Sequence, residues 1–408
     1  MIELLVFTVF LLLAILVTFF AMYQLALACS YFIVREQPSP PMAPQKRFAV
    51  IIPAHNEESM IGAALESWAR VDYPPDLFSV HVIADNCTDR TAEVVLARGG
   101  SCLERQDPDR QGKGYALAWA LETITLDPYD AIVIVDADTA VCPDFLLAMN
   151  TRLVGGAKVI QGFDGILNPD ESLLTRLMHI TNIMKNLLFN HAKSKVGLSV
   201  QLMGTGMCFD RAVLQKLGWN AFSIGEDGEQ FSYLAEAGVR VEFEPRAIVY
   251  AHEASSFDQA YTQRIRWSSG RMQLVGLGLR LLGRGIRRRD LHLIDAALTF
   301  LIPSYVQLGN VTILACCLTL FVTVPGRDVL LPWFSALLAA QALYFFMGLG
   351  MSGLSTKSLS SLSLVPVFLV WKMGVDLIAI LHLNRSVWVR TARLSSREKR
   401  SGLSTIPR

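Results

Sequence analysis

Two acidic residues separated by one alanine, Asp136 and Asp138, follow an apolar run that is typical of a buried strand. Residues 131–139 read Ala-Ile-Val-Ile-Val-Asp-Ala-Asp-Thr. Successive strand side chains point to opposite faces, so we predict that both carboxylates lie on one face. Carboxylate oxygens there could bind a hard divalent cation together with phosphate oxygens. An isolated pair of this kind could also lie in a surface turn, so its meaning depends on the rest of the chain.

A second acidic pair, Glu226 and Asp227, lies among the apolar residues Phe222, Ile224 and Phe231. Apolar surroundings raise the pKa of a carboxyl group toward the working range of a general base. Aspartate also favours the N-terminal cap of a helix. The sequence therefore leaves Asp227 open between a catalytic base and a helix cap.

Three residues at helical spacing, Gln263, Arg266 and Trp267, carry an amide, a guanidinium and an indole. An indole can stack on the C–H face of a sugar, and a guanidinium can hold a diphosphate through paired hydrogen bonds. Lys113 lies between two glycines and could contact a phosphate as a point charge or belong to the solvated surface. The glycines around it, like those at 204 and 206, lack the spacing of a P-loop or a dinucleotide site, and the 204–206 pair is interpreted as a tight turn.

The elements that must position these residues alternate between apolar strands and charged helices from residue 46 to about 290. This alternation predicts an α/β domain with a largely parallel sheet. Ligands of such sheets bind beyond the carboxyl ends of the strands, where several of the polar clusters fall. The predicted strands are 48–53, 79–84 and 131–139, and the predicted helices are 57–70, 91–98 and 115–123.

The composition is more apolar than that of an ordinary soluble enzyme. The chain has 408 residues, of which 52% are hydrophobic and 18% are charged, and its mean hydropathy is +0.37. The net charge of +1 lacks the excess of basic residues that is typical of nucleic-acid-binding proteins, so we expect no nucleic-acid partner. The seven cysteines show no metal-ligand spacing and are expected to be reduced and structural.

Residues 1–34 are predicted to form an uncleaved transmembrane anchor, because no basic residue precedes the apolar run and no small-residue cleavage site is evident. A Pro-rich linker over 35–45 leads into the domain at 46–270. The basic residues Arg35, Lys46 and Arg47 follow the anchor, which predicts a cytoplasmic catalytic domain on a multi-pass protein of the cell inner (plasma) membrane.

The rest of the chain is predicted to be membrane-associated. Residues 271–290 form a basic interfacial helix, and 291–384 hold two spans, 296–324 and 329–350, with a kink near Pro303. The segment 362–383 contains Lys372 and Asp376. We predict that it is re-entrant or interfacial, since a full span would put the basic tail, 385–408, outside, against the positive-inside rule.

Five motifs occur in the order found in family 2 glycosyltransferases, and the last resembles that of membrane-embedded cellulose, chitin and hyaluronan synthases. The resemblance covers about residues 48–270, and Trp-Val-Arg-Thr-Ala-Arg at 388–393 is also similar to those enzymes. It implies a GT-A fold, a Rossmann-like nucleotide-diphospho-sugar transferase domain, with flanking transmembrane and interfacial helices. The motifs are Val50–Glu57, Asp85–Asp89, Asp136-Ala-Asp138, Glu226-Asp227 and Gln263-x-x-Arg266-Trp267.

Carried over position by position, the resemblance implies that Glu57 and Asp85 help hold the nucleoside and that Lys113 approaches the donor. Asp136 would lie near the nucleotide and Asp138 would bind Mg²⁺ or Mn²⁺ on the diphosphate. Asp227 would be the base of a single inverting displacement. Gln263, Arg266 and Trp267 would bind substrate, and residues 203–208 would form a floor beneath the acceptor, as an alternative to a structural turn.

Two departures from the family pattern, Ala84 in place of a paired aspartate and Gly225 in place of a threonine, leave the key carboxylates intact. The first functional hypothesis is an inverting enzyme that builds an extracellular or envelope polysaccharide from UDP-GlcNAc or UDP-Glc. The second is transfer of one sugar to a lipid-linked acceptor, and the third is a non-catalytic membrane subunit. Membrane lipids and an export or assembly subunit are the other expected partners.

Overall fold

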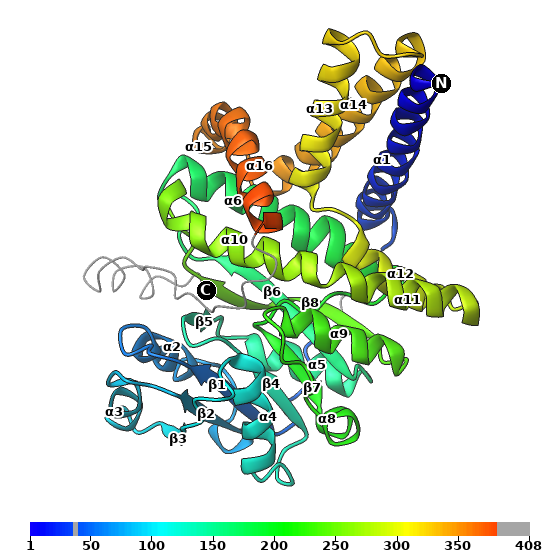
Figure 1. Cartoon of the computed structure of the whole chain (residues 1–408). Coiled ribbons are helices and arrows are strands. Elements are labelled where there is room, and N and C mark those ends of the chain that lie inside the picture. Colours follow the sequence, from blue (N-terminus) through cyan, green and yellow to red (C-terminus); the bar gives the residue numbers. More distant parts are fainter. Residues whose placement is uncertain (36–39, 382–408) are drawn as a thin grey trace.

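An α/β domain with long helices beside it forms the structure, a computed structural model that describes residues 1–35 and 40–381 (Figure 1). Its sheet has eight strands in the order β3-β2-β1-β4-β7-β6-β8-β5. Strands β3, β2, β1 and β4 run parallel, whereas β7 is antiparallel to both of its neighbours and β5 is antiparallel to β8. The sheet is therefore mixed, and the largely parallel prediction holds for its first half. The strands are β1 (Phe48–Ala54), β2 (Phe78–Asp85), β3 (Ser101–Arg105), β4 (Ala131–Ile134), β5 (Thr139–Val141), β6 (Val159–Ile166), β7 (Met207–Asp210) and β8 (Val241–Ala251).

Strand β1 shows why the sheet is covered on both faces. Val50 and Ile52 pack into one apolar cluster and Ala49 and Ile51 into another, and all four are fully buried. A strand with two buried faces has a continuous apolar sequence, which is what the sequence shows. The first cluster includes residues of α2 (Ile61–Trp68), α3 (Thr91–Leu96) and α5 (Phe145–Val154), and the second those of α4 (Lys113–Thr123), α8 (Arg211–Leu217) and α9 (Glu226–Glu236).

The aspartate pair lies in a turn, so the prediction that Asp136 and Asp138 share one face of a strand is wrong. Strand β4, in the middle of the sheet, ends at Ile134. The chain then turns and forms β5, which pairs with β8 at the edge of the sheet farthest from β3. The sequence shows one continuous apolar stretch because both short strands are buried. Residues between them face the cavity through turn geometry rather than strand alternation.

The predicted helices exist with shifted ends. Helix α2 begins at Ile61 rather than at residue 57, because the Glu57 carbonyl accepts hydrogen bonds from the amides of Met60 and Ile61 in a preceding turn. Helix α4 begins at Lys113, two residues earlier than predicted. Helix α10 (Phe257–Gln273) contains the Gln263–Trp267 motif, and α11 (Val275–Arg288) follows it. The predicted basic helix therefore starts four residues later than expected, and its contact with a membrane stays a prediction.

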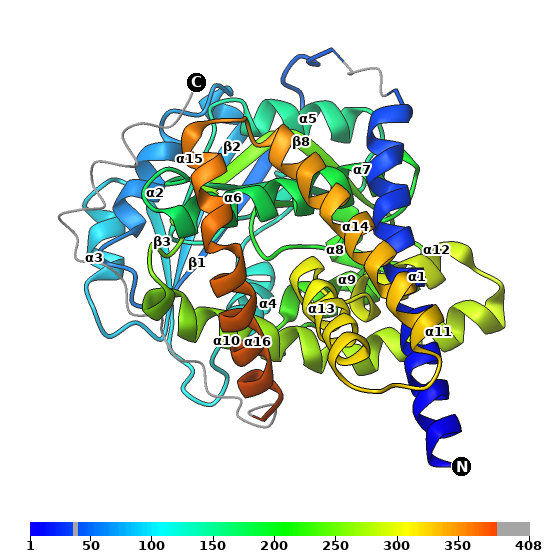
Figure 2. The ribbon, with the colours of Figure 1, turned by 90° about the horizontal axis from the view of Figure 1, so that it is seen from above.

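An insertion between β6 and β7 adds α6 (Leu173–Ile183), the π-helix η2 (Met184–His191) and α7 (Ala192–Lys195). Figures 1 and 2 show α6 and α10 on the side of the sheet that faces the C-terminal helices. Met178 of α6 contacts Arg264 of α10. These helices therefore lie between the sheet and the apolar end of the molecule.

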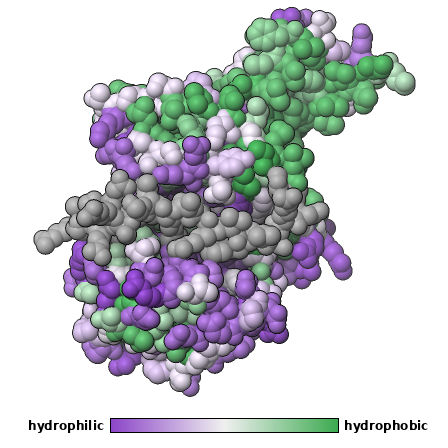
Figure 3. Space-filling view, turned by 60° about the vertical axis from the view of Figure 1, so that its left-hand side comes forward, coloured by the Kyte–Doolittle hydropathy of each residue, from purple (hydrophilic) through white to green (hydrophobic). Residues whose placement is uncertain are grey.

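Three helices within the described residues are long and apolar enough to cross a membrane: Ile2–Ile33, Arg327–Met351 and Thr356–Leu381. The first is α1, the second α14, and the third joins α15 (Thr356–Ser360), η3 (Ser361–Leu364) and α16 (Val365–Leu381). Figure 3 shows apolar residues gathered at this end of the molecule, away from the polar surface of the α/β domain. A re-entrant course for 362–383 stays a prediction, and the 385–408 tail lies outside the described residues.

The chain breaks at Pro303, where the sequence predicted a kink in the segment 296–324. Helix α12 (Leu291–Leu301) and α13 (Tyr305–Phe321) are bent by 67° and would together make a fourth candidate span. Proline has no amide hydrogen, so it cannot continue the helix ladder. Ser304 then caps α13 through a reciprocal capping box with Gln307.

Candidate active site

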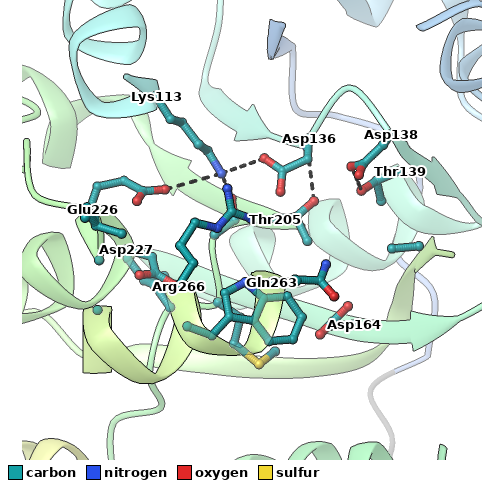
Figure 4. A pocket seen from close by; sticks show the side chains of 18 of the residues that line it. Lys113, Asp136, Asp138, Thr139, Asp164, Thr205, Glu226, Asp227, Gln263 and Arg266 are labelled. Carbon is teal, nitrogen blue, oxygen red and sulfur yellow. Dashed lines mark hydrogen bonds and ion pairs between the residues drawn. The ribbon is translucent and has the colours of Figure 1, made fainter. Parts of the chain in front are cut away.

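A cavity of about 1150 Å³ opens at the carboxyl ends of β1, β2 and β4. Figure 4 shows side chains from the sheet edge, from α4, from the start of α9 and from α10 converging on it. The fold brings together residues that are more than 200 positions apart in the sequence. All nine sequence-predicted site residues line this cavity: Glu57, Asp85, Lys113, Asp136, Asp138, Asp227, Gln263, Arg266 and Trp267.

Lys113 lies in the polar part of the cavity, so of the two alternatives that the sequence left open the structure excludes the solvated surface. Its Nζ donates to Asp136 Oδ1 at 2.6 Å and to the Gly204 carbonyl at 2.6 Å, and lies 3.5 Å from Glu226 Oε1. Gly114 lets this first turn of α4 approach the next segment, because a Cβ there would meet the Ala221 carbonyl oxygen at 2.0 Å. The close contact fixes the start of α4 and hence the position of the ammonium group.

Burial dominates the electrostatics around Lys113. It raises the pKa of Glu226 to about 7 and also raises the pKa of Asp136 and of Asp227. Burial alone lowers the pKa of Lys113, but the charges of Asp136 and Glu226 outweigh it and raise that pKa above its ordinary value. The cavity thus holds a firmly charged ammonium group among carboxylates that resist ionisation.

The acidic pair starts helix α9, for which Gly225 is the N-cap residue. Asp227 lies in the first turn, where its Oδ1 accepts a hydrogen bond of 2.7 Å from the Gly228 amide. Its Oδ2 faces the 203–206 turn, since a Cβ at Gly204 would lie 3.7 Å from that oxygen. Asp227 is therefore at a helix N-terminus without being the cap, and it lines the cavity beside the proposed acceptor floor.

The glycines of that floor adopt the conformation of a tight turn. Gly204 and Gly206 have φ of +84° and +66°, which favours glycine. Met203 and Thr205 line the cavity as well. The segment is thus a turn that also lies on the cavity wall.

Helix α10 presents Gln263, Arg266 and Trp267 to the cavity. Within the described part of the chain, Arg266 has no ion pair or side-chain hydrogen bond, although its charge favours ionised Asp136. Its neighbour Arg264 stacks over the Trp267 ring at 4.5 Å and forms an ion pair of 2.7 Å with Glu253. Arg266 is therefore available to a ligand anion, while Arg264 orients the indole.

Asp85 is held by a buried arginine that the sequence reasoning missed. Arg105 on the neighbouring strand β3 contacts Asp85 Oδ1 at 2.5 Å and Asp107 at 2.9 Å. The parallel register places Asp85 opposite Arg105, so the signal becomes visible only when the two strands are paired. This contact fixes the carboxylate at the end of β2.

The sequence assigned no site role to several other cavity residues. Glu226 was recognised as part of a motif but received no role. Asp164 and Lys185 form an ion pair of 2.8 Å, and both line the cavity. At the end nearest the candidate spans the lining includes Arg271, Ser304, Gln307 and Lys372. Apart from Glu226, these residues come from β6, η2, α10, the start of α13 and α16, which only the tertiary structure brings together.

The donor set fits a metal ion that protein and diphosphate hold jointly. Among the described residues, no group of three His, Cys, Asp or Glu side chains is arranged to hold an ion alone. Asp136 and Asp138 nevertheless offer hard carboxylate oxygens to the cavity. Mg²⁺ and Mn²⁺ favour such ligands and commonly share their coordination with substrate phosphates.

Comparison with known proteins agrees with this chemistry. A family model described as "Glycosyltransferase like family 2" matches residues 44–270, more than half of the chain. The chain is 28% identical over 243 residues to a probable glycosyltransferase, YdaM, of Bacillus subtilis, with 56% of each chain covered. It is 27% identical over 300 residues to an N-acetylglucosaminyltransferase of Sinorhizobium fredii, covering 69% of this chain and 70% of that protein.

Among solved structures, a mannosyltransferase of Pyrobaculum calidifontis, determined with GDP-Man and Mn²⁺, has a similar fold. The TM-score is 0.56 at 19% identity, and the match covers 91% of this chain and 97% of that one. At this coverage the match includes residues of this chain beyond the α/β domain. On the family match and this fold, the chain belongs to glycosyltransferase family 2 and is a glycosyltransferase with a GT-A domain.

Proposed function

We propose that the chain is a membrane-bound, inverting glycosyltransferase that uses a UDP-sugar, UDP-GlcNAc or UDP-Glc, and a divalent metal to build an extracellular or envelope polysaccharide. The observation that carries the proposal is the cavity in which Lys113 bridges Asp136 and Glu226 beside Arg266, which has no ion pair with any described residue. The N-acetylglucosaminyltransferase name of the Sinorhizobium relative supports the choice of sugar. The multi-pass inner-membrane location, with the α/β domain in the cytoplasm, is part of this proposal.

The donor occupies the sheet edge in this proposal. Glu57 and Asp85 hold the nucleoside, and Lys113, Asp136 and Arg266 surround the diphosphate. Asp138, with Asp136 beside it, would hold Mg²⁺ or Mn²⁺, and the ion would supply positive charge at the diphosphate. Arg266 adds a guanidinium that can form paired hydrogen bonds with phosphate oxygens.

The acceptor lies between Asp227 and the indole of Trp267. Asp227 takes the proton of the acceptor hydroxyl, whose oxygen forms a bond to the anomeric carbon. The carbon–oxygen bond to the diphosphate breaks at the same time, and the diphosphate leaves with the electron pair. Attack from the face opposite the leaving group inverts the anomeric centre. Gln263 and Trp267 orient the acceptor sugar.

A second candidate is the transfer of one sugar to a lipid-linked acceptor. It is favoured by the course of the cavity, which reaches Gln307 in α13 and Lys372 in α16. Both helices belong to candidate spans, alone or as part of the bent pair. An acceptor anchored in lipid could approach the site there.

Nucleotide release by the detergent-purified chain tests the proposal. A panel of UDP-GlcNAc, UDP-Glc and GDP-mannose is incubated with Mn²⁺ or Mg²⁺, and Asp227→Asn is measured in parallel. We expect release with one UDP-sugar that is abolished by chelator and reduced at least about 100-fold in Asp227→Asn, because a positioned base contributes about 10²- to 10⁴-fold.

Release from GDP-mannose alone would contradict the proposed donor. Metal-dependent UDP binding without turnover on any added acceptor would favour the non-catalytic subunit. Product length, measured on the released glycan or on extracted lipid, separates the polymer-forming enzyme from the single-sugar transferase.

A further inference from the structure

The cavity continues from the sheet edge to a second group of charged side chains at its membrane end. Arg271 of α10 and Lys372 of α16 line it there. Ser304 and Gln307, in the capping box that starts α13, complete the same wall. The proposed donor chemistry uses none of these four residues.

The positive charges at this end exceed the negative ones. Lys372 pairs with Asp376 one turn later on α16, and its Nζ also lies 3.1 Å from Ser268 Oγ. Ser268 donates a second hydrogen bond of 2.8 Å to Asp376. Among the described residues Arg271 forms no ion pair: it donates a hydrogen bond to a neutral group, the carbonyl of Ile302 at the break between α12 and α13, and interacts with the charge of Asp376 without contacting it. Two cations therefore share one carboxylate.

Burying two cations with a single carboxylate destabilises the fold unless a bound anion balances the second positive charge. The side chain of Lys372 is only 13% exposed, in a segment apolar enough to cross a membrane. Apolar residues would stabilise a purely structural helix contact as well or better than a buried ion pair. Ionisable residues in membrane segments that face an internal cavity commonly mark a substrate path. The unbalanced positive charge indicates that the ligand is an anion.

We propose that Arg271 and Lys372 bind a phosphate group on the acceptor. The guanidinium offers two parallel hydrogen bonds to phosphate oxygens, and the ammonium group contributes a compact charge. Ser304 and Gln307 add polar contacts at the start of α13, where the helix dipole also favours an anion. The inference rests on the proposed transferase function and specifies its acceptor as a phosphate-bearing molecule, either a lipid phosphate or a soluble phosphate ester.

Direct binding tests this site without requiring turnover. The full-length chain in dodecyl maltoside micelles is titrated with monododecyl phosphate, with 1-dodecanol and with inorganic phosphate. We expect saturable binding of monododecyl phosphate, at least about tenfold tighter than that of dodecanol, since a hydrogen bond to a charged group contributes about 1.5–3 kcal/mol. Displacement by inorganic phosphate would identify phosphate alone as sufficient, and binding without displacement would identify a lipid phosphate.

Variants of the ion pair distinguish recognition from folding. The double variant Lys372→Met/Asp376→Leu removes both charges together, so it leaves no unpaired carboxylate, and it should weaken monododecyl phosphate binding at least about tenfold. Asp376→Asn removes the internal counter-ion of Lys372 and should tighten binding. Lys357→Met is the matched control, because Lys357 lies outside the cavity lining and contacts the Asp170 carbonyl.

Equal binding of monododecyl phosphate and dodecanol would overturn the proposal, as would unchanged binding in the double variant or weaker binding in Asp376→Asn. UDP binding by the same preparations reports on the donor site independently. Loss of UDP binding with retained monododecyl phosphate binding would count against the proposed transferase donor site. Retained UDP binding without binding of monododecyl phosphate would count against the phosphate site alone.

Discussion

At the residue scale, three carboxyl groups around one ammonium group determine how the cavity responds to pH. Asp136, Glu226 and Asp227 all have raised pKa values because burial disfavours their charge. Only Lys113 bridges two of them directly. A bound metal and diphosphate would change this balance, since the cation stabilises the ionised carboxylates.

Glu226 should make the ligand-free protein less stable as the pH rises. Its ordinary pKa is 4.5 and its pKa in the folded chain is about 7, so between these values the folded chain holds a proton that the unfolded chain releases. The free energy of unfolding therefore falls from about pH 4.5 to about pH 7. Glu226→Gln should flatten that fall, as measured by melting temperature in detergent. The exposed Glu66→Gln variant is the control, and an unchanged slope in Glu226→Gln would contradict the assignment.

Lys113 should be required for nucleotide binding. Lys113→Met removes the cation that faces the diphosphate in the proposed complex and leaves Asp136 without its partner. We expect UDP affinity in the presence of Mn²⁺ to fall about 10- to 100-fold, the range for one charge-assisted hydrogen bond. Calorimetric titration measures it. Lys158→Met, which breaks an exposed ion pair with Asp210, should keep wild-type affinity, and equal affinity in both variants would remove Lys113 from the donor site.

At the element scale, the position of α4 depends on a close contact with the segment before α9. A Cβ on Gly114 would lie 2.0 Å from the Ala221 carbonyl oxygen, so backbone atoms would have to move. The Tyr115 and Phe222 rings stack at 4.6 Å across the same junction. Sequence alone shows only a glycine after a lysine, because the contacting segment is about 100 residues away.

Gly114→Ala should therefore displace α4, whereas Gly283→Ala should be tolerated. Gly283 lies inside α11 with no atom within 4 Å of its Cβ position. The first change should lower the free energy of unfolding by more than about 2 kcal/mol and weaken UDP binding, and the second should raise it by up to about 1 kcal/mol. Thermal unfolding in detergent measures both. Similar melting temperatures for the two variants would show that the contact is not tight.

At the scale of the whole molecule, a buried polar network joins α1 to the α/β domain. Lys193 of α7 is fully buried, lies 2.9 Å from Asp295 of α12 and donates to Thr299 at 2.8 Å. Tyr23 of α1 donates to the same aspartate. Thr299 also lines the cavity, so the network connects the N-terminal helix to the wall of the site.

Removing Lys193 alone should lower the free energy of unfolding more than removing Lys193 and Asp295 together. Lys193→Met leaves Asp295 without its cation and should lower the free energy of unfolding by about 3–5 kcal/mol. The double variant Lys193→Met/Asp295→Leu should recover most of that loss, because no unpaired charge remains. Denaturant unfolding in detergent compares them. A double variant no more stable than Lys193→Met would show that the charged pair itself is stabilising.

The predicted topology places the C-terminal tail in the cytoplasm. With the seven native cysteines replaced, a cysteine at Ser401 should be shielded from impermeant thiol reagents in intact cells and react after permeabilisation. The reason is the basic character of the tail and the positive-inside rule. A cysteine at Glu66, on the α/β domain, is the matched probe for the cytoplasmic side. Labelling of Ser401→Cys alone in intact cells would show that Thr356–Leu381 crosses the membrane fully.

The sequence by itself determined the α/β class, the family and nine of the residues that line the cavity. Local apolar patterns specify strands and helices, and the ordered motifs name side chains whose chemistry is independent of their neighbours. It also located Pro303 as an interruption of the membrane segment. These features depend on residues that are close together in the chain.

Tertiary structure decided how those residues meet. Asp136 and Asp138 lie in a turn because β4 is in the middle of the sheet and β5 is at its edge. The break between the two strands is not visible in the sequence, because both are buried and apolar. Likewise, the pairing of Asp85 with Arg105 and the approach of Lys372 to Arg271 depend on contacts between distant segments. Such contacts follow from strand register and helix packing, which a local pattern of residue types does not specify.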